Sequence, residues 1–135
     1  MAYKIEEIEG IGPAYGAKLQ EAGIATTDDL LAQCGAKDGR EAMAAKTGLT
    51  ESQLLKWTNM ADLMRISGVG EEYSELLEAA GVDTVKELAT RRADNLTAKM
   101  GEVNEAKKLV RQVPAQGNVE KWIEQAKTMD PKVSH

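Results

Sequence analysis

An internal repeat constrains the fold of this chain more than any other feature of its sequence. Residues 8–30 read IEGIGPAYGAKLQEAGIATTDDL, and residues 66–88 read ISGVGEEYSELLEAAGVDTVKEL, at a constant offset of 58. Nine of the 23 aligned positions are identical: Ile8/Ile66, Gly10/Gly68, Gly12/Gly70, Tyr15/Tyr73, Leu19/Leu77, Ala22/Ala80, Gly23/Gly81, Thr26/Thr84 and Leu30/Leu88. Self-similarity of this kind indicates a duplication.

A second match extends the repeat along the chain. Residues 54–64 and 119–129 align at an offset of 65, and they share Lys56/Lys121, Trp57/Trp122, Ala61/Ala126 and Met64/Met129. The offset grows from 58 to 65, so the second copy carries an insertion between its matching segments. We therefore expect the 135 residues to form a single domain made of two repeats, residues 1–65 and 66–135.

The composition favours helices over strands as the elements of both units. The chain contains no Phe, and aromatic residues make up 4% of it, so that the 42% of hydrophobic residues are mainly aliphatic. A core of Leu, Ile, Val, Ala and Met suits helices, and no window shows sustained alternation of β-branched residues. We expect an all-α fold without a sheet, with Trp57 and Trp122 on apolar helical stripes that pack centrally against each other.

Capping residues place the predicted helices. Those of the first unit are residues 13–22, a helix capped by Thr26 or Thr27 that ends near Gly35, residues 39–46, and a helix opened by a Thr50/Gln53 capping box that runs to about Ile66. Those of the second unit are residues 71–80, residues 85–90, residues 95–100 capped by Asp94, a helix capped by Asn104 that ends before Pro114, and a helix capped by Asn118 that runs through Met129.

Two glycine-flanked turns are the most informative local motif. Gly10-Ile11-Gly12 and its copy Gly68-Val69-Gly70 each stand before a predicted helix. Glycines permit positive φ in a tight reversal, and the aliphatic residue between them is expected to point into the core. The first amides of the following helix then point outward without partners, which is a place to hold a phosphate oxygen.

Each turn and the helix after it resemble the helix-hairpin-helix motif. The two copies in register resemble the tandem domains of DNA repair and recombination proteins and the C-terminal domain of the bacterial RNA polymerase α subunit. Over essentially the whole chain, the sequence is similar to a bacterial family of small stand-alone tandem helix-hairpin-helix proteins of unassigned function. The resemblance implies two tandem units packed as one compact domain that binds a DNA or other nucleic-acid backbone without reading its sequence.

The resemblance also implies which atoms would make contact. Hairpin amides would bind phosphates, sometimes with a monovalent cation held by hairpin carbonyls. Carried over to this sequence, the contacts would come from Gly10, Gly12, Ala14, Gly68, Gly70 and Glu72.

The charges depart from the DNA-binding version of the motif. Nucleic-acid-binding members often place Lys or Arg where this chain has Ala14 and Glu72. The second hairpin is followed by Glu71, Glu72 and Glu75, and the first is preceded by Glu6, Glu7 and Glu9. The first basic residue after the first hairpin is Lys18. Residues 88–113 offset this with a local charge of 6 − 3 = +3, from Arg91, Arg92, Lys99, Lys107, Lys108 and Arg111 against Asp94, Glu102 and Glu105.

Two function hypotheses therefore stand side by side. In the first, the chain is a small non-enzymatic protein that binds a nucleic-acid backbone through Gly10, Gly12, Ala14, Lys18, Gly68, Gly70, Arg91, Arg92, Lys107, Lys108 and Arg111. In the second, phosphate binding has been lost, and the chain is a protein-interaction adaptor whose acidic face meets a basic protein partner through Glu71, Glu72, Glu75 and Glu78. The net charge of −5 favours the second hypothesis.

Other classes of protein are disfavoured by residue counts. One cysteine, Cys34, and one histidine, His135, supply neither an internal disulfide nor a usual metal site nor a nucleophilic triad. We expect no cofactor, no catalysis and a partly buried, unreactive Cys34. No apolar run approaches the roughly 20 residues that cross a bilayer, and the first residues lack the apolar region of a signal peptide, so we expect a cytoplasmic protein.

Overall fold

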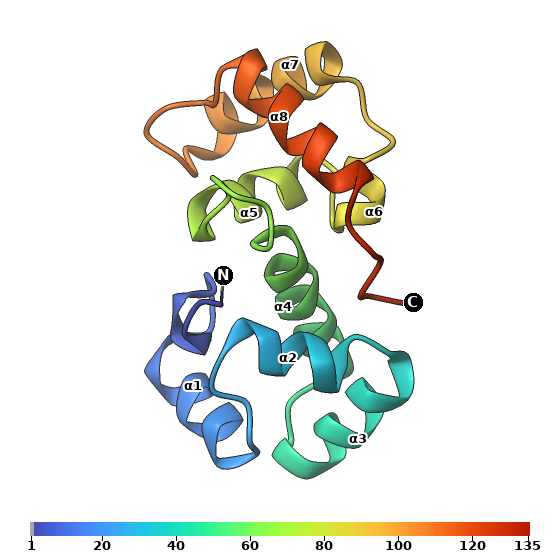
Figure 1. Ribbon diagram of the computed structural model, residues 1–135. Coiled ribbons are helices and arrows are strands. Elements are labelled where there is room, and N and C mark those ends of the chain that lie inside the picture. The colour runs from blue at the N-terminus through green and yellow to red at the C-terminus, as the bar shows by residue number, and fades with distance from the viewer. Residues whose placement is uncertain (1) are drawn as a thin grey trace.

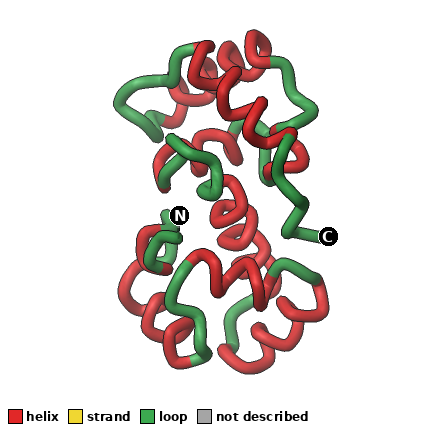
Figure 2. Tube along the Cα trace, viewed as in Figure 1, coloured by secondary structure: helices red, strands yellow, loops and turns green. Residues whose placement is uncertain are grey.

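The computed structural model describes residues 2–135, and these residues form eight α-helices, a short 3-10 helix and no strand (Figures 1 and 2). The elements are η1 (Ile5–Glu7), α1 (Gly12–Glu21), α2 (Thr27–Cys34), α3 (Lys37–Thr47), α4 (Glu51–Leu63), α5 (Glu71–Ala79), α6 (Val85–Leu88), α7 (Ala93–Lys107) and α8 (Gln116–Lys127). The predicted all-α class is confirmed. Among the helices of residues 2–135, none combines the length and the apolar character that a bilayer-spanning segment needs.

Local capping accounts for the helices of the first half. The Thr26 side chain accepts a hydrogen bond from the Asp29 amide (3.2 Å), and Asp29 bonds back to the Thr26 amide (3.1 Å). Hydrogen bonds from the Ala25 and Thr26 amides hold the pKa of Asp29 below its usual value. Thr50 and Gln53 form the predicted capping box of α4. These signals lie within one turn of each helix start, which is why they could be predicted.

Three predicted helix caps of the second half were wrong. Residues 93–107 form one helix, α7, where two were expected, and Asp94 lies inside its first turn instead of capping it. Asn104 also lies inside α7, where its side chain bonds the amide of Val110 (2.9 Å) and its carbonyl oxygen (3.0 Å) and so holds the following loop. The last helix begins at Gln116, two residues before Asn118.

The buried side chains gather in two clusters, one in each half. The first core contains Trp57, and the second contains Trp122; each tryptophan is 4% exposed. The expectation that the two tryptophan helices pack against each other is therefore wrong. Helix α4 runs from one half toward the other and contacts α2, α3 and α5, as Figure 1 shows. It ends with Leu63 in the second core and is followed by Met64 in the first.

The same set of contacts surrounds each tryptophan. Tyr15 lies against Trp57 with ring centroids 5.3 Å apart and an interplanar angle of 53°. Tyr73 lies against Trp122 at the same 5.3 Å and at 51°. The residues after α1 and α5 also turn alike, because Gly23 and Gly81 have φ of 93° and 96°.

A buried carboxylate joins α4 to the start of α6. Asp62 is 1% exposed, and its Oδ1 accepts a hydrogen bond from Arg65 Nε (2.9 Å). Its Oδ2 accepts another from the Val85 amide (2.8 Å). Both oxygens of a buried charge are thus satisfied, as burial of a charge requires.

A buried arginine holds the C-terminal tail, residues 130–135, against the first half. Arg40 of α3 is 3% exposed and donates to the carbonyl oxygens of Cys34 (3.0 Å), Gly35 (2.9 Å) and Ser134 (2.6 Å). The Ser134 amide donates to the Gly35 carbonyl (2.9 Å), and Val133 packs against the first core. The tail thus crosses from the end of α8 back onto α2 and α3.

Replacing this arginine should destabilise the protein. In Arg40→Ala, three carbonyl oxygens lose a charged donor in a site with little access to water, and we expect the free energy of unfolding to fall by about 3 kcal/mol. Urea denaturation followed by circular dichroism measures the change. Arg111→Ala, at an exposed position, is the control and should cost less than about 0.5 kcal/mol; equal losses in the two variants would contradict the role of Arg40.

Candidate functional site

The first hairpin has the geometry that its sequence predicts. Gly10 and Gly12 have φ of 93° and 62°, values that side-chain-bearing residues rarely adopt. Ile11 between them is 2% exposed and lies in the first core. Within residues 2–135, the Gly10 amide donates to no protein acceptor. The reversal and the inward aliphatic residue are therefore confirmed here.

The second hairpin differs at one glycine. Gly68 has φ of 94°, and Val69 is fully buried, as in the first copy. Gly70, however, has φ of −102° and serves as the N-cap of α5, where its carbonyl accepts the Ser74 amide (2.9 Å). Glycine was expected to supply either positive φ or a close approach, and Gly70 shows neither, since an added Cβ there would meet nothing within 4 Å. The difference arises because α5 begins one residue later in the repeat than α1 does.

The charges of acidic residues before the first hairpin act on acidic residues at the start of α5. We call Glu7, Glu9, Glu71, Glu72 and Glu75 the acidic cluster. Partial burial, followed by the negative charges of Glu9, Glu7 and Glu72, raises the pKa of Glu71 above its ordinary value. Partial burial and the charge of Glu9 likewise raise the pKa of Glu75. The residues before the first hairpin therefore face the first turns of α5 closely enough to repel them.

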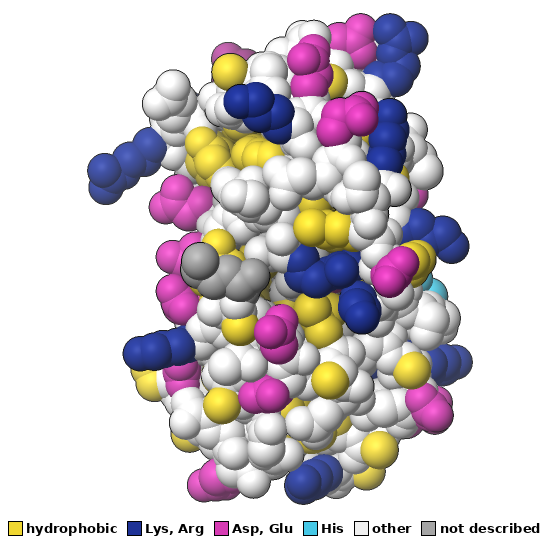
Figure 3. Space-filling model, in the orientation of Figure 1, with side chains coloured by type: hydrophobic (Ala, Val, Ile, Leu, Met, Phe, Trp, Pro, Cys, Tyr) yellow, Lys and Arg dark blue, Asp and Glu magenta, His cyan; other side chains and the backbone are white. Residues whose placement is uncertain are grey.

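Two of the basic residues of 88–113 are paired with neighbouring carboxylates. Arg91 pairs with Glu87 (2.9 Å) and also donates to the Gly81 carbonyl (2.9 Å). Arg92 pairs with Asp94 (3.0 Å), and this hydrogen bond lowers the pKa of Asp94. On the face in Figure 3, basic and acidic side chains alternate, and the basic ones form no continuous strip.

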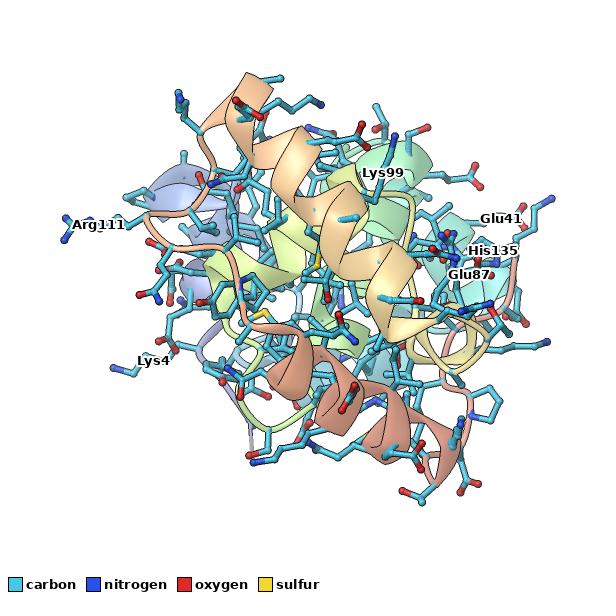
Figure 4. All side chains as sticks on the ribbon, turned by 90° about the horizontal axis from the view of Figure 1, so that it is seen from above. Lys4, Glu41, Glu87, Lys99, Arg111 and His135 are labelled. Atoms are coloured by element: carbon cyan, nitrogen blue, oxygen red, sulfur yellow. The ribbon has the colours of Figure 1, made fainter. Side chains whose placement is uncertain are left out.

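The remaining predicted basic residues are exposed but lie far from the first hairpin. Helices α7 and α1 occupy opposite ends of the molecule (Figure 1). Lys107 and Lys108 end α7, and Arg111 projects into solvent on the side opposite Glu87 and His135 (Figure 4). Lys18 and the neighbouring Ala14 are exposed on α1. The structure therefore does not bring the residues of 88–113 beside the first hairpin.

Three of the basic side chains do share a cavity, at the other end of the second half. Arg91, Arg92 and Lys99 line a hollow of ≈ 430 Å³ together with Ala80, Thr90, Asn95 and Leu96. We call this hollow the basic pocket. It lies between the end of α5 and the start of α7, and the sequence did not predict it because it depends on how those two helices pack.

The structure offers little reactive chemistry. Cys34 is fully buried, more than expected, and burial raises the pKa of its thiol to about 11. The thiolate, which is the reactive form, is therefore scarce at neutral pH. Across residues 2–135, no grouping of three or more His, Cys, Asp or Glu side chains is arranged to hold a metal ion.

A family described as a domain of unknown function, DUF4332, matches residues 9–129. The chain belongs to the DUF4332 family. The match covers both hairpins, the acidic residues of α5 and the whole of α8, so that the DUF4332 domain includes both halves of the structure. No curated protein and no solved structure matches this DUF4332 chain.

Two features of this DUF4332 domain escaped the sequence analysis. The acidic residues were recognised near each hairpin separately, but their convergence depends on the placement of one half against the other. Asn59, an amide on the buried side of α4, was overlooked. Its position inside the segment 54–64, whose Trp57 lies on a predicted apolar stripe, is a signal that could have found it, because buried amides need hydrogen-bond partners.

Alanine substitutions should separate the two glycines of the second hairpin. In Gly68→Ala, the new Cβ sits at positive φ and 3.1 Å from Trp122 Nε1, so we expect a loss of stability of about 2 kcal/mol. In Gly70→Ala, φ is negative and the Cβ meets nothing within 4 Å, so stability should stay equal or rise by about 0.5 kcal/mol. Urea denaturation measures both, and similar losses in the two variants would contradict the observed hairpin geometry.

Removing one charge from the acidic cluster should stabilise the protein at neutral pH. The folded state raises the pKa of Glu71 above 4.5, so its ionisation opposes folding above that raised pKa and ceases to oppose it as the pH falls toward 4.5. We expect Glu71→Gln to gain less than about 1 kcal/mol at pH 7, because Glu71 is exposed, and to lose that gain in acid. Glu105→Gln on α7 is the control; a gain independent of pH would argue against the cluster.

Proposed function

We propose that this chain is a non-catalytic interaction module that uses its acidic cluster to bind a basic protein partner. The observation that carries the proposal is the convergence of glutamates from both halves beside the two hairpins. Partial burial, followed by neighbouring negative charges, raises the pKa of Glu71 and of Glu75, so an approaching cation stabilises their ionised forms. A concentrated negative surface also steers a positively charged protein toward the site.

The same cluster opposes phosphate binding at the hairpins. A phosphate held by the amides around Gly10 or Gly68 would approach several carboxylates, and each such like-charge contact costs on the order of 1 kcal/mol near a surface. The hairpins supply free amides but no basic side chain in their first turns, where α5 instead has Glu71 and Glu72. The geometry therefore supports the protein-interaction hypothesis better than DNA binding at the first hairpin.

We further propose that the two halves are tandem helix-hairpin-helix units. Supporting observations are the matching Tyr–Trp contacts, the buried Ile11 and Val69 at the centres of the hairpins, and the equal φ of Gly10 and Gly68. In this proposal each unit keeps its hairpin as a structural connection between helices, and the charged residues around it decide what it binds.

The basic pocket supports a second candidate function. Arg91, Arg92 and Lys99 bring three positive charges to one cavity, and Lys107, Lys108 and Arg111 are exposed on the same half. A nucleic-acid backbone could be held there through its phosphates, with no base reading. This would place the nucleic-acid site on α7 and the loops beside it and not on the first hairpin.

Neutralising pairs of glutamates tests the main proposal. A fluorescent lysine-rich peptide should bind the wild-type protein at about 50 mM salt and more weakly at about 200 mM. The double variant Glu9→Gln/Glu75→Gln should weaken binding about tenfold, because it removes two charges from the acidic cluster. Fluorescence anisotropy measures the affinity. The matched control Glu102→Gln/Glu105→Gln removes two charges from α7; an equal loss there would show that net charge, and not the cluster, is responsible.

Duplex DNA in the same assay tests the second candidate. Binding that falls steeply with salt and is lost in Arg92→Gln/Lys99→Gln would support the basic pocket as a phosphate site. No binding of duplex or single-stranded DNA at about 50 mM salt would reject it.

A further inference from the structure

A cavity between α4 and α5 contains polar groups that neither hairpin nor core explains. It has a volume of ≈ 400 Å³ and is lined by residues of α4, by one residue of α5, and by two residues of the loop that follows: Ser52, Leu55, Lys56, Asn59, Glu78, Gly81 and Asp83. It therefore lies where the two halves meet, next to the acidic cluster on α5.

Two acceptor atoms in this cavity lack donors. Asn59 Oδ1 and Glu78 Oε2 are both buried from solvent and have no hydrogen-bond partner among residues 2–135. Asn59 is only 7% exposed, so water has little access to its oxygen. A buried acceptor without a donor costs free energy that a ligand carrying N–H groups would recover. Two such acceptors in one cavity point to a ligand that donates several hydrogen bonds.

The charges of the lining select a cation. Glu78 and Asp83 are carboxylates, while Lys56 is the one basic side chain of the lining residues. Lys56 acts on Glu75, where its positive charge opposes the rise in the pKa of that carboxyl. An anion would meet the carboxylates of Glu78 and Asp83 and the unpaired amide oxygen of Asn59 here, which disfavours phosphates and acidic peptides as ligands.

We propose that this cavity takes the guanidinium group of an arginine side chain from the basic partner. A guanidinium is planar, always charged and presents five N–H donors, so that one group can reach a carboxylate oxygen and an amide oxygen together. An ammonium is a compact, strongly hydrated point charge and suits a narrow buried pair of acceptors less well. This inference rests on the proposed function, because it names the side chain by which the basic partner is anchored beside the acidic cluster.

The position of the cavity fits an anchor of this kind. Glu75 and Glu78 are three residues apart on α5 and therefore lie on one side of the helix. Glu75 belongs to the acidic cluster, whereas Glu78 lines the cavity and carries a buried oxygen without a donor. A partner segment that crosses the cluster would thus bring an arginine to the cavity and leave its neighbouring basic residues over the cluster.

Small amides of the two basic amino acids test the cavity directly. In a ¹H–¹⁵N NMR titration, L-argininamide should shift the side-chain amide of Asn59 and the backbone amides of Glu78, Gly81 and Asp83. L-lysinamide carries the same charge and should bind about tenfold more weakly at the same salt, because it satisfies fewer acceptors. Equal affinities, or shifts that lie outside the cavity, would overturn the proposal.

Three variants assign the binding to the orphan acceptors. Asn59→Leu and Glu78→Gln should each weaken L-argininamide binding about tenfold, whereas Glu105→Gln, which removes an exposed charge outside both the cavity and the acidic cluster, should change it less than about twofold. Circular dichroism checks that each variant is folded. Glu78 is half-buried, so Glu78→Gln carries the test if Asn59→Leu does not fold. Asn59 amide hydrogens bonded to Glu78 in the free protein would also overturn the proposal, since no acceptor would then be free.

A peptide comparison separates this inference from the proposed function. A short peptide of alternating arginine and glycine should bind more tightly than its lysine counterpart, and Glu78→Gln should abolish the difference. If Glu9→Gln/Glu75→Gln weakens peptide binding but Glu78→Gln does not, the acidic cluster stands as the partner-binding surface and the arginine cavity is overturned. If no basic peptide binds while L-argininamide still shifts Asn59, the proposed partner is overturned and the cavity stands as a guanidinium site.

Discussion

The position of one half against the other depends on the hydrogen bonds of Asp62. This residue lies near the end of α4, is almost fully buried, and uses one carboxylate oxygen for Arg65 and the other for the first amide of α6. A buried carboxylate that loses its partners is strongly unfavourable, so this geometry resists change. Because α5 lies between α4 and α6 in the chain, its position is held from both sides. The acidic cluster and the α4–α5 cavity both follow from that position.

Charge is distributed unevenly over this framework. The glutamates that precede the first hairpin meet those that begin α5, whereas Arg91, Arg92 and Lys99 meet at the far side of the second half. Both arginines are also paired with neighbouring carboxylates. An overall charge of −5 therefore describes neither surface well. What a partner meets depends on which side of the second half it approaches.

Sequence reasoning succeeded where the signal lies within one helical turn. Thr26, Thr50 and the inward Ile11 and Val69 belong to motifs of a few residues, and the structure places them as expected. It failed for α7, because Asp94 and Asn104 are good caps in isolation but lie within a helix whose Leu96 and Met100 are held in the second core. Packing outweighed a local preference there.

The candidate site shows the same limit more sharply. The repeat predicted two equivalent units, but the prediction that their tryptophan helices pack against each other was wrong, because each tryptophan lies in a core of its own. The acidic cluster and the orphan acceptor of Asn59 arise only after α5 is set against α4, and contacts of this kind join residues far apart in the sequence. Even the two hairpins differ, since Gly12 and Gly70 adopt opposite signs of φ despite their matching positions.

The tail held by Arg40 also has a consequence for how the protein is made. The arginine belongs to the first half, but Ser134, which supplies one of its three carbonyl partners, lies 94 residues later in the chain. During synthesis the first half therefore emerges with Arg40 incompletely paired and with the core beneath Val133 uncovered. The nascent chain exposes this patch until residues 130–135 have emerged and bound to it.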